Sequence, residues 1–231
     1  MSLVEVNHLS KTYQMGEVTI SALKDVSLDI EVGTFVSIVG PSGSGKSTIL
    51  NLVGCLDQPT SGSIKVVDQE VGKLNNRQRA DFRGQHLGFV FQNFNLIPVL
   101  SVYENVEYPL LMVKNESSAK HKDRILKLLD AVGVIDQKDK RPSQISGGQM
   151  QRVAVARALI TQPKLVIADE PTANLDHDTA YKIINLMKEM KNQFNTTFVF
   201  STHDPKIIGE AEIIYTLEDG MIKNREDRRT K

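Results

Sequence analysis

The stretch that decides the fold is Gly40-Pro41-Ser42-Gly43-Ser44-Gly45-Lys46-Ser47-Thr48. It fits the pattern of a glycine, four residues and Gly-Lys-Ser/Thr that is typical of loops that bind phosphate groups. The apolar, β-branched segment at 34–39 precedes it, as expected of a buried parallel strand, and a helix is expected to begin near Lys46. A glycine-rich turn is the alternative, but the full motif directly after a strand favours a nucleotide-binding loop.

Each residue type in this loop has a physical role in holding phosphate. Glycines adopt backbone angles that are closed to other residues, and they let a ligand approach closely. The N–H groups of the loop and of the helix N-terminus then form an anion site. We expect Lys46 to reach the β- and γ-phosphates of ATP and the Ser47 hydroxyl to coordinate Mg²⁺. The expected nucleotide contacts are Gly40, Pro41, Ser42, Gly43, Ser44, Gly45, Lys46, Ser47 and Thr48.

Two carboxylates follow a second apolar run, at 165–168. Carboxylates at the end of a buried strand are costly unless they serve a cation or a proton. We therefore expect Asp169 to hold the hydration shell of Mg²⁺ and Glu170 to polarise the attacking water. A solvated acidic loop is the alternative for this pair alone, and the phosphate-binding loop upstream favours the functional interpretation.

Polar residues also follow two further apolar runs, at 87–91 and 197–202. Gln92 comes directly after the first run and His203 after the second. The carboxyl ends of strands gather at one edge in doubly wound sheets, so we expect both side chains near the γ-phosphate. Taken alone, a histidine after a strand is more often structural, and a single glutamine carries no signal.

A second motif, Ser146-Gly147-Gly148-Gln149, lies about a hundred residues after the loop. Ser146 is a favourable N-cap, and two glycines admit close approach of a phosphate at the start of an amphipathic helix. The tetrapeptide alone would also fit a capped turn before a helix. The order of all these elements, however, resembles the nucleotide-binding subunit of ATP-binding cassette (ABC) transporters over nearly the whole chain.

The resemblance assigns roles to individual residues. Ser146, Gly147, Gly148 and Gln149 resemble the family signature, with Ile145 where the family more often has leucine. By the same resemblance, Tyr13 stacks on adenine and residues 174–176 contact a second copy. Gln92 would bind Mg²⁺, sense the γ-phosphate and signal to a membrane partner, and His203 would be the switch histidine.

The resemblance also implies a fold. We expect an α/β phosphate-loop NTPase of the RecA-like type, with a mainly parallel sheet, an N-terminal antiparallel β subdomain and an inserted α-helical subdomain. One domain would span residues 1–231, with the helical part at about 93–160. Residues 3–37 and 63–67 alternate as antiparallel strands do. Helical faces are formed by Val102, Val106 and Leu110, and by Ile125, Leu128, Leu129 and Val132.

Two identical chains would sandwich two ATP molecules head to tail in a closed two-fold arrangement. In such a dimer each ATP, with its Mg²⁺, contacts the loop of one chain and Ser146 to Gln149 of the other. Glu170 is intact, which indicates a hydrolysing site.

Composition narrows the class of partner. The 231 residues carry 28 Lys+Arg and 28 Asp+Glu, and this balance argues against a nucleic-acid partner bound through a basic field. The longest apolar runs fall well short of the roughly twenty residues that a bilayer requires, so a membrane role must come through a partner. The N-terminal segment is typical of a strand and not of a signal peptide. The single cysteine, Cys55, suits a reducing cytoplasm and a place in the core.

Residues 54–62 and 104–111 look like one bacterial branch of the family, which serves lipoprotein release, macrolide and peptide export, and cell division. Its partners are integral membrane permeases with few spans and a large extracytoplasmic domain. This implies a cytoplasmic subunit held on the inner face of the membrane. Apolar residues in 91–98 would form either a groove for a permease helix or ordinary packing.

Several alternatives stay open. Importers of amino acids share part of the stretch at 94–96. Soluble members of the superfamily act on ribosomes or DNA, although this chain has one module and no long heptad run. A non-hydrolysing regulatory module and a phosphate-loop kinase are further rivals. At the end of the chain we expect a strand over 212–217 and a frayed, charged tail over 224–231.

Overall fold

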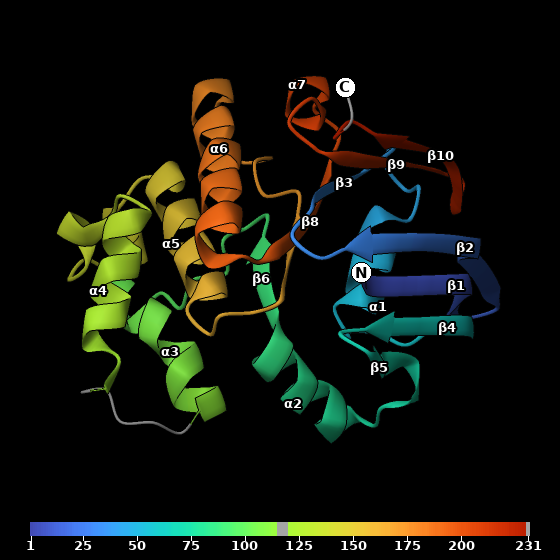
Figure 1. The fold of residues 1–231 in the computed structure, drawn as a ribbon, viewed down its shortest axis with the longest axis horizontal. Coiled ribbons are helices and arrows are strands. Elements are labelled where there is room, and N and C mark those ends of the chain that lie inside the picture. The colour runs from blue at the N-terminus through green and yellow to red at the C-terminus, as the bar shows by residue number, and fades with distance from the viewer. Residues whose placement is uncertain (115–119, 230–231) are drawn as a thin grey trace.

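A computed structural model describes residues 1–114 and 120–229 of the chain. Its larger sheet has six strands in the order β10-β9-β3-β8-β7-β6, and all neighbours are parallel except β9 and β10 (Figure 1). The strands are β3 (Phe35–Val39), β6 (Leu87–Phe91), β7 (Leu165–Asp169), β8 (Thr197–Thr202), β9 (Ile213–Glu218) and β10 (Met221–Asp227). The expected parallel core, with strands at each predicted apolar run, is confirmed.

A separate antiparallel sheet lies beside the parallel one, on the right in Figure 1. Its strand order is β2-β1-β4-β5, and the strands are β1 (Ser2–Met15), β2 (Val18–Glu31), β4 (Ser61–Val66) and β5 (Gln69–Glu70). Burial along β2 alternates because one face packs on the core. The first two strands of this sheet end at Glu31, whereas the alternation suggested antiparallel strands up to residue 37. The segment after Glu31 instead forms β3, which pairs with β8 and β9.

Seven α-helices surround the sheets within the part of the chain that the structure describes. They are α1 (Lys46–Val53), α2 (Asn76–His86), α3 (Val102–Lys114), α4 (Lys122–Ala131), α5 (Gly147–Leu159), α6 (His177–Phe194) and α7 (Pro205–Ile208). Short 3₁₀ turns cover Val71–Lys73, Ile135–Gln137 and Pro142–Gln144. Helices α3, α4 and α5 lie on the side away from the antiparallel sheet (Figure 1). The predicted helical faces at 102–110 and 125–132 are buried, which confirms them.

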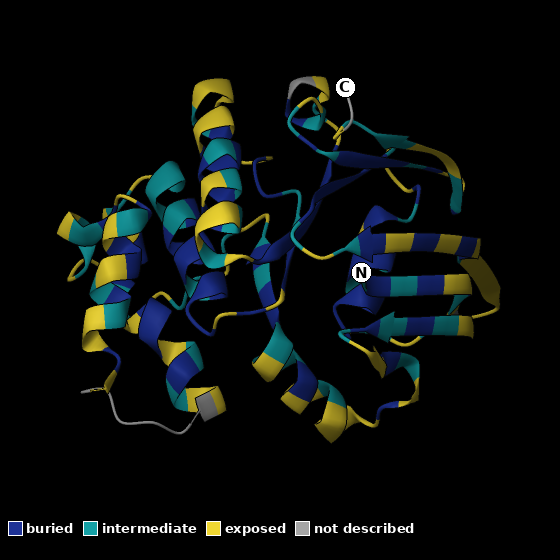
Figure 2. Cartoon of the chain, viewed as in Figure 1, coloured by how far each residue is buried: buried dark blue, intermediate teal, exposed yellow. Residues whose placement is uncertain are grey.

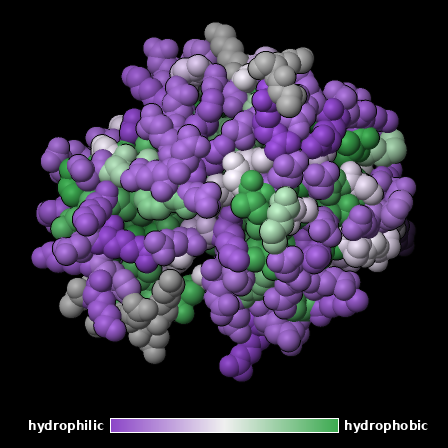
Figure 3. All heavy atoms as spheres, in the orientation of Figure 1, coloured by the Kyte–Doolittle hydropathy of each residue, from purple (hydrophilic) through white to green (hydrophobic). Residues whose placement is uncertain are grey.

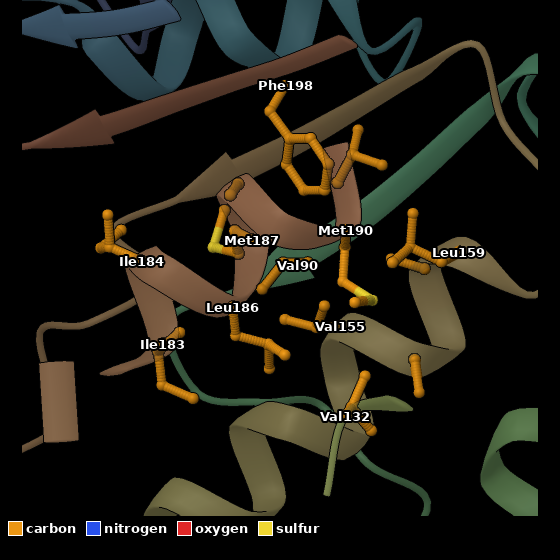
Figure 4. Close-up of a cluster of buried hydrophobic side chains, with 14 of the residues drawn as sticks. Val90, Val132, Val155, Leu159, Ile183, Ile184, Leu186, Met187, Met190 and Phe198 are labelled. Atoms are coloured by element: carbon orange, nitrogen blue, oxygen red, sulfur yellow. The ribbon is translucent and has the colours of Figure 1, made fainter. Parts of the chain in front are cut away.

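The core consists of two clusters of buried apolar side chains. The first fills the space between the parallel sheet and helices α3 to α6, and Figure 4 shows part of it, including Val90, Leu159, Met187 and Phe198. The second lies between the parallel sheet, α1 and the antiparallel sheet, and it contains Val6, Ile38, Leu50 and Cys55. Cys55 is 1% exposed, as predicted. Burial follows the inner faces of the elements, with exposed residues on the outer face of α6 (Figure 2).

The prediction of a frayed tail is wrong for residues 224–229. Residues 224–227 belong to β10, where Arg225 pairs with Tyr215 of β9. Beyond the strand, the Arg229 guanidinium donates to both carboxylate oxygens of Glu31, at 2.8 and 3.0 Å. Strand pairing and this ion pair order a segment that we expected to be frayed because of its mixed charge. Residues 230–231 lie outside the described part.

Candidate active site

The glycine-rich loop connects β3 to α1, and its glycines have backbone angles that other residues rarely adopt. The φ values are 154° at Gly40, 78° at Gly43 and 105° at Gly45. A methyl group at Gly40 would lie 2.0 Å from the Leu217 carbonyl oxygen, and one at Gly45 would lie 2.7 Å from that of Ala22. The loop therefore has this shape because glycines occupy these positions.

The loop fits a phosphate ligand. No acidic residue lies in the first turn of α1, and no side chain of the described residues caps it, so its N–H groups can face an anion. Lys46 is 8% exposed, and its ammonium donates to the carbonyl oxygens of Gly40 and Pro41 at 2.9 and 3.0 Å. An ammonium has three N–H groups, so one remains for a ligand. The Ser44 hydroxyl is buried without a hydrogen-bond partner among the described residues, which also suits a bound phosphate.

A cleft of about 650 Å³ lies beside this loop. It is formed where β3, β6, β7 and β8 end, as the parallel topology requires. Predicted residues from four separate chain segments line it, namely Ser42, Gly43, Gly45, Lys46, Ser47, Thr48, Gln92, Asp169, Glu170 and His203. The lining is completed by Ile20, Ser21, Ala22 and Ala173, to which no sequence motif pointed.

The carboxylate pair stands at the end of β7. Asp169 is the last residue of the strand, and Glu170 turns the chain away with φ of +47°, in the left-handed region. The Glu170 carboxylate lies 2.8 Å from Nδ1 of His203. Its side chain is 19% exposed, whereas that of His203 is 69% exposed, so the pair sits at the mouth of the cleft. A carboxylate held beside an imidazole can orient and polarise a water molecule.

The polar side chains of the cleft also fit Mg²⁺. This ion takes oxygen ligands, keeps several waters and is held by one or two carboxylates together with substrate phosphates. The Ser47 hydroxyl, the Gln92 amide and the Asp169 carboxylate supply such oxygens. In residues 1–114 and 120–229 no three His, Cys, Asp or Glu side chains gather as a metal site.

Tyr13 is fixed by a small polar network instead of lining the cleft itself. Its hydroxyl donates to Asp57 at 2.8 Å, and Lys11 donates to the other oxygen of Asp57 at 2.8 Å. The Lys11 ammonium also lies 4.7 Å from the centre of the Tyr13 ring. In the β1–β2 pairing Tyr13 lies opposite Ile20, which does line the cleft.

The titration of these groups reflects their contacts. Burial and the hydrogen bond to Asp57 raise the pKa of Tyr13. Burial alone would raise the pKa of Asp57, but the hydrogen bonds from Lys11, the Gln58 N–H and Tyr13 outweigh it and lower the pKa. Asp57 is therefore a carboxylate at neutral pH and holds the tyrosine ring in place.

The second motif caps α5 as predicted. The Ser146 hydroxyl accepts from the Gln149 N–H at 3.3 Å, and the Gln149 side chain accepts from the Ser146 N–H at 2.9 Å. This reciprocal pair is a capping box. A separate cavity of about 380 Å³ lies over it, lined by Ser146, Gly147, Gly148, Gln149, Arg152, Asn174, Leu175, Asp176, Thr179 and Lys182.

The two cavities share no lining residue among those described. Helices α1 and α5, which begin at the two motifs, lie in different halves of the molecule (Figure 1). One chain therefore does not bring the loop at 40–48 and the motif at 146–149 to the same ligand.

Two buried polar residues lie behind the site, and neither was assigned a role from the sequence. Gln151 is fully buried in α5 and donates to the Pro171 carbonyl oxygen at 2.6 Å, directly after Glu170. Ser201 is fully buried in β8 and contacts both Asp169 and Glu170. A motif search passes over both because neither faces the cleft.

The fold and the cleft define a phosphate-loop ATPase, and comparison with known proteins identifies the class more closely. The sequence profile of the ABC transporter family (ABC_tran) matches residues 23–173. The chain is 43% identical over 226 residues to the "Lipoprotein-releasing system ATP-binding protein LolD" of Pseudoalteromonas translucida, covering 98% of this chain and 97% of that one. It is also 43% identical over 224 residues to the "Macrolide export ATP-binding/permease protein MacB" of Syntrophobacter fumaroxidans, of which it spans 31%.

A solved structure of an ATP-binding cassette is also similar to this chain over nearly its whole length. The "Dimeric structure of a post-hydrolysis state of the ATP-binding cassette MJ0796 bound to ADP and Pi" superposes with a TM-score of 0.90 at 43% identity, covering 98% of this chain and 99% of that one. MJ0796 comes from Methanocaldococcus jannaschii. The chain belongs to the ABC transporter family. It is an ATPase of that class and binds ATP, which confirms the expected family, fold and enzyme activity.

Proposed function

We propose that this chain is the ATP-hydrolysing subunit of a membrane complex, and that ATP drives two copies together to move a permease partner. The observation that carries the proposal is the separation of the two nucleotide motifs within one chain. The cleft around Lys46 and the cavity over Ser146 have different linings, so each ATP requires a second copy to meet both. The dimeric MJ0796 cassette with ADP and Pi supports this arrangement.

ATP acts as a ligand that favours the closed dimer. In that dimer one nucleotide contacts Lys46 and Ser47 of one copy and Ser146 to Gln149 of the other. A ligand shifts such an equilibrium only through its higher affinity for one state, and the second set of contacts supplies that difference. Tyr13, held by Asp57 and Lys11, would stack on the adenine from the first copy.

Hydrolysis would then reopen the dimer. Glu170 orients and polarises the attacking water from the end of β7, and His203 holds its carboxylate at 2.8 Å. Ser47, Gln92 and Asp169 would hold Mg²⁺, which neutralises charge that develops on the phosphates. This chain's own contribution is to place donors and one base around the phosphates before the reaction begins.

The proposed site for the permease is a second groove, of about 380 Å³, on the edge formed by β6, α2 and α3. Phe89, Phe91, Pro109 and Val113 give it an apolar lining, and Arg83 and Arg157 add charge. Met112 is 64% exposed at the end of α3 next to it. Apolar atoms are exposed among polar ones on the face of the molecule that Figure 3 shows. An apolar groove of this kind suits a short helix from a partner.

Hydrogen bonds connect the segment beside this groove to α5, which begins at Ser146, and join Gln92 of the ATP cleft to Asn174 of the second cavity. Arg157 of α5 donates to the carbonyl oxygens of Phe94 and Asn95, at 2.8 and 2.5 Å. Asn174, from the cavity over Ser146, donates to the Gln92 carbonyl oxygen at 3.0 Å. Dimer closure would therefore displace the groove and pull on the helix that it holds.

The partner that we favour has few membrane spans and a large extracytoplasmic domain, and the complex would serve export, lipoprotein release or transmembrane force transmission. The resemblance to LolD and to the ATP-binding part of MacB, whose name includes a permease, supports this branch. An amino-acid importer is the second candidate, because residues 94–96 are shared with that class. No helix in the described residues combines the length and apolarity needed to cross a membrane. We place the whole chain, as one domain, on the inner face of the cell membrane through its partner.

An affinity purification tests the proposal. The tagged Glu170→Gln chain is captured from detergent-solubilised membranes with ATP, in parallel with a Met112→Asp, Val113→Asp variant as a control for the groove. Co-purification of a permease with about four spans and a large extracytoplasmic domain, lost in the control, is the expected result. A many-span permease would favour the importer, and soluble or ribosomal partners alone would contradict a membrane role.

A further inference from the structure

Ser201 lies buried at the point where two strand ends of the active site meet. It is fully buried in β8, next to the parallel strand β7 that carries Asp169. The regular pairing of the two strands ends at Ala168 and Phe200, so the backbone of Glu170 has left the sheet. The structure therefore requires another partner for the Glu170 N–H group at this position.

The hydroxyl of Ser201 contacts both residues of the carboxylate pair. It accepts a hydrogen bond from the Glu170 N–H at 2.9 Å and donates one to Oδ1 of Asp169 at 2.6 Å. A hydroxyl can fill both roles at once because it has one donor and two acceptor positions. The short bond to the carboxylate is of the charge-assisted kind, which is the stronger class.

These two bonds restrain two different features. The first holds the turn in which Glu170 has φ of +47°, an angle that is unusual for a residue other than glycine and that sets the direction of its side chain. The second engages one oxygen of Asp169 from behind, so that the carboxylate cannot rotate freely. The Glu170 carboxylate is held separately, by His203 at its other end.

We propose that Ser201 is a positioning residue for ATP hydrolysis, which couples the orientation of the Asp169 carboxylate to the backbone turn at Glu170. The proposal rests on the proposed function, in which Asp169 serves Mg²⁺ and Glu170 serves the attacking water. Ser201 itself touches neither ATP nor water. Loss of its hydroxyl frees the Asp169 carboxylate and the backbone turn at Glu170 without changing the loop that binds the phosphates.

The chain offers a matched control for this hydroxyl. Ser37 of β3 is also fully buried and lies opposite Phe200 of the same strand β8. Its hydroxyl has no hydrogen-bond partner among the described residues. Ser37→Ala therefore removes the same atom at the same depth without breaking a bond to the carboxylate pair.

The test compares Ser201→Ala, Ser201→Val and Ser201→Thr with Ser37→Ala in the full chain. Steady-state ATPase activity gives kcat and KM, and amide hydrogen exchange of the nucleotide-free protein reports on the Glu170 N–H. Ser201→Ala and Ser201→Val should lower kcat about threefold to tenfold and leave KM unchanged. A rate change of this size corresponds to the net free energy of a typical hydrogen bond. Both variants should also speed exchange at Glu170. Ser201→Thr keeps the hydroxyl at the volume of valine and should restore both values, and Ser37→Ala should leave both unchanged.

Each outcome decides for or against the proposal. Unchanged kcat and unchanged Glu170 exchange in Ser201→Ala would overturn it. Equal changes of kcat in Ser201→Ala and Ser37→Ala would also overturn it and indicate a general packing role. The same holds if kcat falls in proportion to the melting temperature across the variants. If threonine does not fit, the comparison of the two alanine variants still decides. Full activity of Glu170→Gln would instead contradict the role of Glu170 in the proposed function.

Discussion

At the residue scale, the proposed chemistry depends on Glu170 and on the contacts that hold it. Its backbone turns in the left-handed region at the end of β7, and His203 holds its carboxylate at 2.8 Å. Lys46, by contrast, is held by the carbonyl oxygens of Gly40 and Pro41 in its own loop. In the proposed function, binding of the phosphates and activation of water rest on different residues, so we expect mutation to separate them.

Replacing Glu170 with glutamine should abolish hydrolysis and leave nucleotide binding intact. The amide keeps the size of the side chain but cannot act as a base, and a general base contributes a factor of about 100 or more. We expect kcat to fall by at least about 100-fold, with the affinity for ATP unchanged in equilibrium binding. Glu189→Gln, at an exposed position of α6, is the control and should behave as wild type. Normal turnover in Glu170→Gln would remove Glu170 from this role.

Most of the cleft could be predicted from the sequence because its chemistry needs particular residue types at particular places. Glycines before Lys46 and carboxylates after an apolar run are visible without a structure. The network around Tyr13 could not be predicted, because Lys11 and Asp57 are 46 positions apart and meet only after folding. Ser201 was also missed, since a serine within a buried strand has no distinctive pattern. The roles of all the predicted site residues, including Lys46, Glu170 and His203, stay predictions.

At the element scale, the first turn of α5 combines two glycines with different surroundings. A methyl group at Gly147 would lie 3.5 Å from the nearest side-chain atom, of Leu175, which is an ordinary contact. A methyl group at Gly148 would lie 2.6 Å from Cγ2 of Thr179. Gly148 is thus required by packing within the chain, whereas Gly147 is not.

This difference separates folding from dimer formation. Gly147→Ala should keep the melting temperature, because alanine also favours helix, yet it should weaken ATP-dependent dimerisation by placing a methyl group on the surface that meets the second nucleotide. Gly148→Ala should lower the melting temperature itself. Thermal unfolding and size-exclusion chromatography in the Glu170→Gln background measure both effects. A Gly147→Ala chain that dimerises as well as its parent would argue against contact between this turn and the nucleotide of a second copy.

The end of β10 gives a pH-dependent prediction. The hydrogen bonds from Arg229 lower the pKa of Asp227 to about 2 and also lower the pKa of Glu31. Because these pKa values are lower in the folded chain, their contribution to stability is full above the unfolded values of about 4 and is lost as the pH falls towards about 2. Charged tails of this composition are commonly frayed, so sequence alone could not show that Arg229 reaches Glu31 across the fold.

Arg229→Ala should therefore lower the melting temperature slightly at pH 7, and the difference from wild type should shrink between pH 4 and pH 3. Thermal unfolding followed by circular dichroism at these values measures it. Lys223→Ala, which removes an exposed cation from the same strand, is the control and should show little change. A difference that is the same at pH 7 and pH 3 would contradict an ionic origin.

At the scale of the whole molecule, the two motifs lie in two separate cavities, which we propose to be halves of two different nucleotide sites. The parallel sheet places the phosphate loop and the carboxylate pair in one cleft, and the helical layer places the Ser146 turn in another cavity. Two copies related by a two-fold axis would complete both sites at once. Hydrogen bonds from Arg157 and Asn174 connect the helical layer to the segment that follows β6. We therefore expect dimer closure to move the groove beside β6 together with the helical layer.

The mass of the Glu170→Gln chain in solution, with and without ATP and Mg²⁺, tests this claim most directly. Light scattering after size-exclusion chromatography should show a monomer of 25.7 kDa without nucleotide and a dimer of twice that mass with ATP. Lys46→Ala in the same background should stay monomeric, since ATP no longer binds. A chain that binds ATP to saturation and remains a monomer would contradict ATP-driven dimerisation as the basis of its function.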